Sequence, residues 1–450
     1  MNNLKEILKP AALTLISLAM IVQFQPARGQ DKGSLADLSA NRTIVEHRLA
    51  QFIDEVKKNN PGLKALASKI SAAQASVNYA KSLDPPQIGV EFYQSPITTF
   101  PNPFDGQREI DYSVQQMFPF PGKLSAMARV EQNRKAMTEG ERTGALQRIV
   151  GDLKAAFYEA YFIQRKIEIN DENREILKSY AAIAQKQYEV GTGKQADILR
   201  AQTELSTLVN NDIVFRQELR SMEAMLNALR NQPVETPVDP IPEIEPPLFD
   251  CPLAGLVKLA LEHRPELSEM EAGVSMQKAE LAAAKKEYYP DFMVRGMYKQ
   301  MLRQSDDWDF TVGITVPVAP WSFGKASAGA NRASLLQNQY EEELNNMKNM
   351  VASEVQQALI AVRSSTDRIK LYKMTVIPQA TQTLNSTLAS YRSGGQDFVS
   401  LIDAHHMLLS ARQDYHMAVM NLMTGISKLE TAVGMSVEDI EKSPMQEERK

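Results

Sequence analysis

The sequence has only one cysteine, Cys251, among its 450 residues. A single cysteine cannot form an intramolecular disulfide, so a disulfide-stabilised fold is excluded. Five histidines, no glycine-rich phosphate loop and no metalloprotease helix motif leave little for catalysis, and the net charge of −5 gives no basic excess for binding nucleic acid. We therefore predict that the chain is not an enzyme, has no cofactor and binds no nucleic acid.

Long apolar runs are also scarce. The run from Ala11 to Val22 follows Lys5 and Lys9 and precedes a stretch of small residues. This order is typical of a secretory signal peptide, which we place at 1–29; a short amphipathic helix that is never removed is the alternative. No later stretch approaches the ~18 uninterrupted apolar residues of a membrane helix, so we expect none in the mature chain.

Proline is absent from two long stretches, 122–232 and 321–377, whereas seven prolines crowd into 232–252. Proline lacks the amide donor and clashes with the preceding turn of a helix. The proline-free stretches are therefore predicted to be long helices, and 232–252 a linker. At 1.5 Å per residue, the segment 123–190 forms a rod of roughly 100 Å.

The chain contains an internal repeat with an offset of 198 to 204 residues. Order and spacing agree over most of each half, which predicts two structural repeats. The repeated pairs include Pro61 and Pro265, Pro86 and Pro290, Asp111 and Asp309, Gly122 and Gly324, Tyr188 and Tyr391, and Ala201 and Ala404.

Each half is predicted to fold as a helical hairpin. Apolar residues in the proline-free stretches follow a 4-3-4-3 spacing, as in Ile149, Leu153 and Ala156, which indicates helices packed lengthwise. Glycines at 191, 193, 394 and 395 interrupt the pattern where a helix can end. Glycine kinks in continuous helices are the alternative, but such helices would be implausibly long.

Two short alternating segments precede each hairpin, at 87–94 and 109–117 and again at 291–301 and 308–316. Their length and weak alternation suit strands of a membrane β-barrel. Four strands cannot close a barrel, and lipid does not tolerate open edges, so several chains must contribute to one barrel.

The predicted organisation follows from these elements. The segments are 1–29 signal peptide, 30–60 N-terminal periplasmic segment, 61–231 first repeat with hairpin 123–231, 232–252 linker, 253–435 second repeat with hairpin 324–435, and 436–450 polar tail.

The pattern resembles the TolC-like outer membrane factor family over nearly the whole mature chain. The markers are Tyr188-x-x-Gly191-Thr192, Tyr391-x-x-Gly394, Asp197-Ile198-Leu199-x-Ala201 and Leu401-Ile402-Asp403-Ala404. The resemblance implies a mainly α fold with a membrane β portion, in which a homotrimer forms a 12-stranded β-barrel in the outer membrane and a 12-helix periplasmic tunnel. It also implies an efflux channel that works with a periplasmic adaptor protein and an inner-membrane pump, expected to be of the resistance-nodulation-division type.

The resemblance assigns functional positions at the two hairpin tips. The adaptor is expected to dock at five tip residues, namely Gly191, Thr192, Gly193, Gly394 and Gly395. In the family, acidic rings after the second tip narrow the tunnel. The resemblance implies that Asp403 takes that role here and that Ser400 stands in place of the second acidic residue, so we expect one ring to be lost. Asp197 and Arg200 occupy the equivalent positions of the first half and are expected to tie neighbouring helices together.

Methionine is abundant, at 21 residues. His416, Met420 and Met423 share one helix face, and Met293, Met297 and Met301 share one face of a strand. Thioethers and imidazoles bind soft ions such as copper(I), but methionine more often fills irregular cores, so we predict no metal site and keep the first trio as the candidate. The alternative function is a periplasmic coiled-coil adaptor or structural protein of a transport assembly, which would need only one hairpin set within β-rich segments.

Overall fold

A computed structural model of the chain describes residues 35–93, 95, 97–102, 109–247, 249, 251–301, 304–317, 319–321 and 323–442. The predicted signal peptide, the first five residues of the segment 30–60 and the last eight residues of the polar tail lie outside this range.

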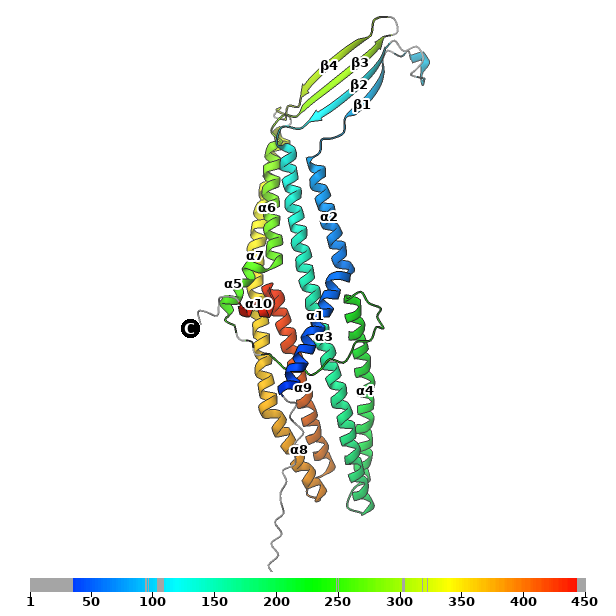
Figure 1. Ribbon diagram of the computed structural model, residues 1–450, viewed down its shortest axis with the longest axis vertical. Coiled ribbons are helices and arrows are strands. Elements are labelled where there is room, and N and C mark those ends of the chain that lie inside the picture. The colour runs from blue at the N-terminus through cyan, green and yellow to red at the C-terminus, as the bar shows by residue number, and fades with distance from the viewer. Residues whose placement is uncertain are drawn as a thin grey trace, which may run out of the picture.

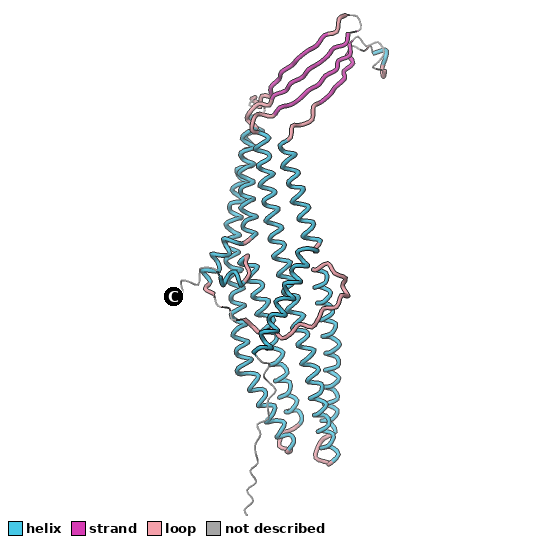
Figure 2. The backbone as a smooth tube through the Cα atoms, in the orientation of Figure 1, coloured by secondary structure: helices cyan, strands magenta, loops and turns pink. Residues whose placement is uncertain are grey.

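The described chain is strongly elongated (Figure 1). A β-sheet stands at one end, long helices run from its foot, and two helical hairpin tips mark the opposite end. Shorter helices and an extended loop surround the middle of the bundle (Figure 2). The fold class predicted from the repeat, with long helical hairpins and two strands in each half, is confirmed. Among the described residues, no helix is both long enough and apolar enough to cross a membrane.

The first hairpin consists of α3 (Lys123–Glu189) and α4 (Gln195–Leu229). α3 runs for 67 residues without a break, which corresponds to about 100 Å at 1.5 Å per residue. Its buried residues are spread along its length, from Ala126 to Ala184, and it packs against α4, α2 (Pro61–Lys81), α6 (Pro265–Lys286) and α9 (Phe398–Val433). Its stability therefore comes from lengthwise packing against several helices.

The second hairpin is interrupted on its descending side. α7 (Phe323–Leu371) passes through a five-residue π-helical segment, η2 (Tyr372–Val376), into α8 (Ile377–Arg392), and α9 (Phe398–Val433) returns. Pro378 lies in the first turn of α8. Proline has no amide hydrogen and collides with the carbonyl four residues earlier. A wider π turn accommodates this clash, which explains why the second rod is divided whereas α3 is not.

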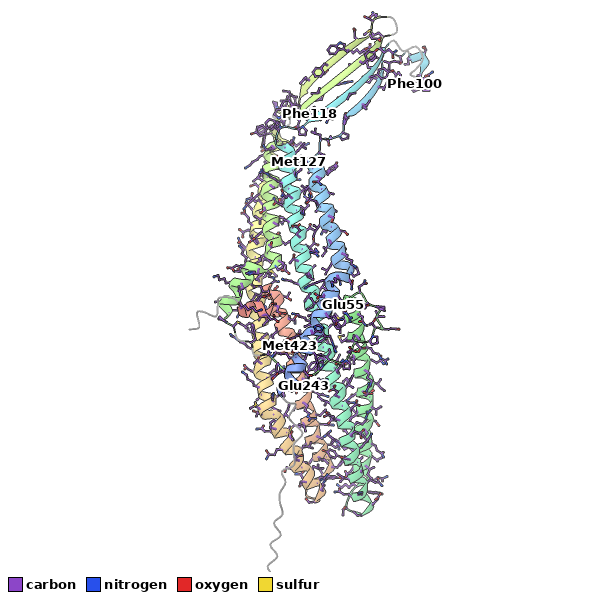
Figure 3. All side chains as sticks on the ribbon, in the orientation of Figure 1. Glu55, Phe100, Phe118, Met127, Glu243 and Met423 are labelled. Atoms are coloured by element: carbon purple, nitrogen blue, oxygen red, sulfur yellow. The ribbon has the colours of Figure 1, made fainter. Side chains whose placement is uncertain are left out.

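The four strands form one antiparallel sheet in the order β1-β2-β3-β4. The central pair, β2 and β3, joins the two repeats, and Phe118 at the base of the sheet (Figure 3) lies opposite Phe292. The strands are β1 (Gln87–Tyr93), β2 (Glu109–Phe118), β3 (Phe292–Met301) and β4 (Asp307–Ile314), and a short 3-10 turn, η1 (Ile97–Thr99), lies between the first two.

The remaining helices cover the upper half and the middle of the bundle. They are α1 (Leu35–Asn59), α2 (Pro61–Lys81), α5 (Leu253–His263), α6 (Pro265–Lys286) and α10 (Val437–Lys442).

The proline-rich linker contains no helix where it is described, and buried polar side chains hold it against the bundle. The amide of the fully buried Asn227 donates to the carbonyls of Val234 and Thr236, at 3.2 and 2.8 Å. Gln164 of α3 accepts from the amide of Ile241 at 2.8 Å. Because prolines leave the linker without internal helix hydrogen bonds, these side chains supply partners that a buried backbone requires.

Candidate functional site

The β-sheet separates apolar from polar residues by face. One face carries exposed aromatic and branched side chains, among them Ile88, Val90, Tyr112, Val114, Tyr298, Trp308, Phe310, Val312 and Ile314. Alternate residues of the same strands place charged groups on the other face, where Arg295 pairs with Glu91 at 2.9 Å and Lys299 with Asp309 at 2.7 Å. An apolar outer band and a polar inner face are the two surfaces of a membrane barrel.

Met293, Met297 and Met301 lie on the polar face together with these charges. The register places Met117 of β2 directly opposite Met293, and the guanidinium of Arg295 contacts the sulfur of Met297 at 3.6 Å. The sequence pattern that placed the three methionines on one face is confirmed, whereas Met117 was missed because its neighbour comes from the other repeat.

A buried ionic contact joins the foot of the sheet to the helices. The ammonium of Lys123 lies 3.0 Å from carboxylate oxygens of both Glu287 and Asp291, and its side chain is only 8% exposed. Asp291 also accepts from the amide of Phe120 at 2.8 Å. This group connects the corner after β2 with the segment before β3, and therefore connects the two repeats.

A glycine follows the end of the descending helix at each of the two tips. Gly191 has φ +76° and Gly394 has φ +79°, the left-handed conformation that residues with a side chain rarely adopt. Their amides donate to the carbonyls of Tyr188 and Tyr391 at 3.0 and 3.1 Å. An added Cβ at either glycine would meet no atom within 4 Å. The two tips therefore project into open space.

Gly193 and Gly395 contribute differently to the tips. A Cβ at Gly193 would lie 2.9 Å from the backbone nitrogen of Tyr188, and one at Gly395 would lie 2.9 Å from the hydroxyl of Ser390. The hydroxyl of the exposed Thr192 donates to the carbonyl of Gln187 at 3.1 Å. The second glycine of each tip thus allows a close return of the chain, while the first glycine and Thr192 are accessible.

The two tips contact each other through the end of α8. Gln187 of α3 donates to the carbonyl of Tyr391 at 3.2 Å, and the ring of Tyr391 packs edge-on against Phe398 with centroids 5.5 Å apart. Burial, and secondarily the nearby carboxylate of Asp197, raises the pKa of Tyr391 to about 12. The contact between Gln187 and Tyr391 was not predicted from the sequence, because it joins residues 204 positions apart in different hairpins.

The predicted gate residues lie in the first turns of the two ascending helices. Asp397 caps α9 by accepting from the amide of Ser400 at 2.9 Å and from its hydroxyl at 2.6 Å. Ser400 thus helps to cap the helix, a role the sequence analysis did not assign to it. Asp403, one turn further on, is exposed beside the buried Ile402 and Ala404. An aspartate at the start of α9 was the available signal for this cap.

Asp197 and Arg200 stand at the corresponding turn of α4, half-buried and exposed respectively. Within the described part of one protomer, no ion pair involves either residue. The structure brings Asp197 near Tyr391 and does not pair it with Arg200. The predicted tie to a neighbouring helix therefore has no partner inside the protomer.

Adjacent histidines on α9 face different environments, because neighbouring residues of a helix point to different faces. His406 lies 3.1 Å from the carboxylate of Glu204 on α4. His405 is 4% exposed and packs edge-on against Tyr180 of α3, with centroids 5.5 Å apart. Neither ring nitrogen of His405 has a hydrogen-bond partner in the described chain. Burial, with a smaller contribution from His406, lowers the pKa of His405 to about 4.

The soft-metal trio lies in the middle of the molecule, where Figure 3 labels Met423. The hydroxyl of Tyr161 lies 3.2 Å from Nδ1 of His416, while Met420 and Met423 pack against the hydrophobic core. Burial, followed by the charges of Arg165 and Arg412, lowers the pKa of His416 to about 4. Across the described residues, no group of three or more His, Cys, Asp or Glu could hold a metal ion.

Comparison with known proteins matches the chain to one family over most of its length. The family model described as outer membrane efflux protein matches residues 52–232 and 256–435. The two matched segments correspond to the two halves, separated by the linker.

Individual relatives are distant. The alkaline protease secretion protein AprF of Pseudomonas aeruginosa is 22% identical over 62% of this chain and 60% of its own length, so the chain spans about three fifths of that relative. The outer membrane protein TolC of Vibrio cholerae is 18% identical over 88% of this chain and 93% of its own. Among solved structures, the outer membrane protein VceC from Vibrio cholerae superimposes with a TM-score of 0.73 at 16% identity, covering 88% of this chain and 99% of that chain. The structural likeness shows the fold.

Proposed function

The chain belongs to the outer membrane efflux protein family, and on this premise we propose that it is the outer-membrane channel of a tripartite efflux system. The observation that carries the proposal is the sheet with one apolar and one polar face, set on a helical bundle whose longest helix, α3, is about 100 Å long. The apolar face suits lipid and the polar face suits a water-filled lumen. The proposal assigns transport rather than catalysis to the chain.

We propose that three copies assemble. One protomer supplies four strands whose outer edges lack partners in the described structure, and open edges are not tolerated in lipid. Three copies give twelve strands and a continuous helical tunnel into the periplasm. A stable soluble monomer would leave the apolar face of the sheet in water, which its aromatic residues disfavour.

We further propose that the tips are the docking sites for a periplasmic adaptor and an inner-membrane pump of the resistance-nodulation-division type. Support comes from Gly191 and Gly394, where nothing occupies the space beside the backbone, and from the exposed Thr192. The two tips together present a small, accessible surface at the end of the molecule furthest from the sheet.

The gate is proposed to lie at the first turns of α9 and α4. Three copies of the exposed Asp403 would form one acidic ring, and Asp197 and Arg200 would link each protomer to its neighbour. This proposal is supported by the exposure of Asp403 and Arg200 and by the absence of partners for them within the described protomer.

The experiment that tests the function uses the purified protein in detergent. We expect a trimer that resists mild denaturant until heated, and channels of defined conductance after insertion into planar bilayers. A folded, detergent-independent monomer without channel activity would refute the proposal.

A further inference from the structure

The sheet has two edges that a neighbouring strand can extend. In the described structure, β1 pairs only with β2, and β4 pairs only with β3. The sequence repeat relates β3 to β1 and β2 to β4. An edge contact between β4 of one copy and β1 of another would therefore repeat the β2–β3 contact that the protomer already contains.

We propose that β4 of one protomer pairs antiparallel with β1 of a second copy in one defined register, in which the numbers of opposing residues add to 404. This register places Ile314 opposite Val90 of the partner subunit. The inference rests on the proposed trimeric channel and adds to it the exact alignment of the strands between subunits.

The register follows from the contact inside the protomer. In the β2–β3 pair the numbers of opposing residues add to 410, as for Phe118 and Phe292. In the repeat, β4 is equivalent to β2 with residue numbers higher by 198, as for Asp309 and Asp111, and β1 is equivalent to β3 with residue numbers lower by 204, as for Pro86 and Pro290. If β4 and β1 oppose each other as β2 and β3 do, their residue numbers add to 410 plus 198 minus 204, which is 404.

The hairpin registers permit one competing alignment. Opposing numbers add to 202 in β1–β2, as for Gln87 and Gln115, and to 606 in β3–β4, as for Phe292 and Ile314. The difference between these two sums, 404, is the combined offset of the two strands of a hairpin in the structure. The offsets read from the sequence, 204 and 198, add to only 402. If the equivalence of β2 and β4 is taken from the hairpins instead of from the sequence, β4 shifts by two residues and the edge register becomes 406.

The tilt of a closed barrel distinguishes the two registers. Within one protomer, Gln87 lies opposite Gln115, Gln115 opposite Arg295, and Arg295 opposite Thr311. Thr311 would then lie opposite residue 93 of the next copy in the 404 register and opposite residue 95 in the 406 register. One step around the protomer therefore shifts the position along β1 from residue 87 by six or eight residues. The stagger over three copies is thus about 18 or about 24 residues.

With about 3.3 Å per residue along a strand and about 4.8 Å between strands, twelve strands are tilted by about 46° for the smaller stagger and about 54° for the larger. Outer-membrane barrels are tilted by about 35–45°. The 404 register is the closer of the two.

The chemistry of the opposing residues agrees with this alignment. Val312 would lie opposite Phe92 of the partner subunit, and Ile314 opposite Val90 of the partner subunit, all on the apolar face. On the polar face, Gly313 would lie opposite Glu91 of the partner subunit. Both faces of the sheet therefore continue across the subunit boundary without a change of polarity, as they do in any register with an even sum; an odd sum is excluded.

Cysteine cross-linking tests the register. In a Cys251→Ala background, Ile314→Cys is combined in turn with Ile88→Cys, Val90→Cys or Phe92→Cys, which report registers of 402, 404 and 406. Directly opposing residues lie within disulfide reach, whereas a shift of two residues separates the Cα atoms by more than the ~7 Å limit. After mild oxidation, we expect covalent trimers from the Val90→Cys combination at about ten times the yield of the other two.

A second set on the polar face guards against misfolding of the first. Thr311→Cys is combined with Tyr93→Cys as the expected pair, and with Glu91→Cys or Ser95→Cys as controls for 402 and 406. Trimers cross-linked best through Ile88→Cys or Phe92→Cys, with the matching polar-face control, would overturn the register and leave the channel proposal intact. If no combination in either set cross-links, the register and the proposed trimeric barrel both fail.

Discussion

The two repeats place equivalent residues in opposite environments. Tyr391, at the end of α8, is 3% exposed between the hairpins, whereas Tyr188, its counterpart at the end of α3, is 46% exposed. Lys123 at the first corner is buried among carboxylates, whereas Lys325 at the second corner is exposed. In each pair, the buried member faces the other repeat and the exposed member does not. A repeat with a neighbour on only one side of the protomer leaves its other side for a further copy.

The tips also differ in charge. The repeat places Arg200 of α4 where α9 has Asp403, and Asp197 where α9 has Ser400. Identical helix geometry therefore presents different charges at the two tips, which allows substitutions at equivalent positions to separate their roles.

The largest effect is expected from a charge at the tip surface. Thr192→Glu should abolish efflux to the level of a deletion, because a carboxylate buried in a docking contact without a partner is strongly unfavourable. Gly191→Glu and Gly394→Glu should act alike, with additional backbone strain from their positive φ. The measurement is the drug or metal sensitivity of cells carrying each variant. Gly324→Glu, at an equally open glycine at the other end of the molecule, serves as the control, and wild-type resistance in all tip variants would contradict the docking assignment.

The corner lysines are expected to differ in their contribution to stability. Lys123→Met leaves Glu287 and Asp291 without their cation, and we expect the free energy of unfolding to fall by about 2 kcal/mol, because both carboxylates keep some solvent contact. Lys325→Met removes an exposed ammonium and should change stability by less than about 0.5 kcal/mol. Thermal unfolding followed by circular dichroism in detergent compares the two. Equal losses would show that the corners have equivalent environments in the assembled protein.

The backbone plan was predictable from the sequence because it depends on local chemistry. The absence of proline over 122–232 predicted α3 and α4, and the alternation in 109–117 predicted β2. The partners of individual polar groups were not predictable. The contacts of Asn227 with the linker and of Lys123 with Asp291 join residues that lie in different elements, and no local pattern identifies them.

The tip region shows the same limit. The positive φ of Gly191 and Gly394 follows from glycine at a helix end, which a sequence can show. The burial of His405 depends on Tyr180, which lies on another helix of the other repeat. Tertiary packing therefore determined the environment of His405, although its helix and its face were predictable.

His405, which packs against Tyr180 between the two hairpins, is expected to make the stability of the protein decrease at acid pH. Its folded pKa of about 4 lies below the ordinary value of 6.5, so the unfolded chain binds more protons between these values. The free energy of unfolding is therefore highest above about pH 6.5, where His405 is neutral in both states, and it falls as the pH drops toward 4. His405→Gln introduces the residue that α4 carries at Gln202 and should reduce this loss by roughly 3 kcal/mol at most. Unfolding midpoints between pH 4 and 7 test this, with the exposed His406→Gln as the control; identical profiles for wild type and His405→Gln would contradict it.

The smallest effect is expected at the proposed gate, where Asp403 and its counterpart Arg200 should act through different mechanisms. Three Asp403 carboxylates around one axis attract cations, and Coulomb's law in water gives about 0.4 kcal/mol between unit charges about 10 Å apart, or about a twofold change in ion ratio. Asp403→Ala should therefore lower cation preference in planar bilayers by about twofold, weaken block by multivalent cations, and leave conductance equal or higher. Arg200→Ala should instead raise conductance, because it removes a link between neighbouring helices and leaves the acidic ring in place. Ion selectivity that is unchanged in Asp403→Ala but altered in Arg200→Ala would contradict the acidic ring at Asp403 and would place the charge that sets selectivity on α4.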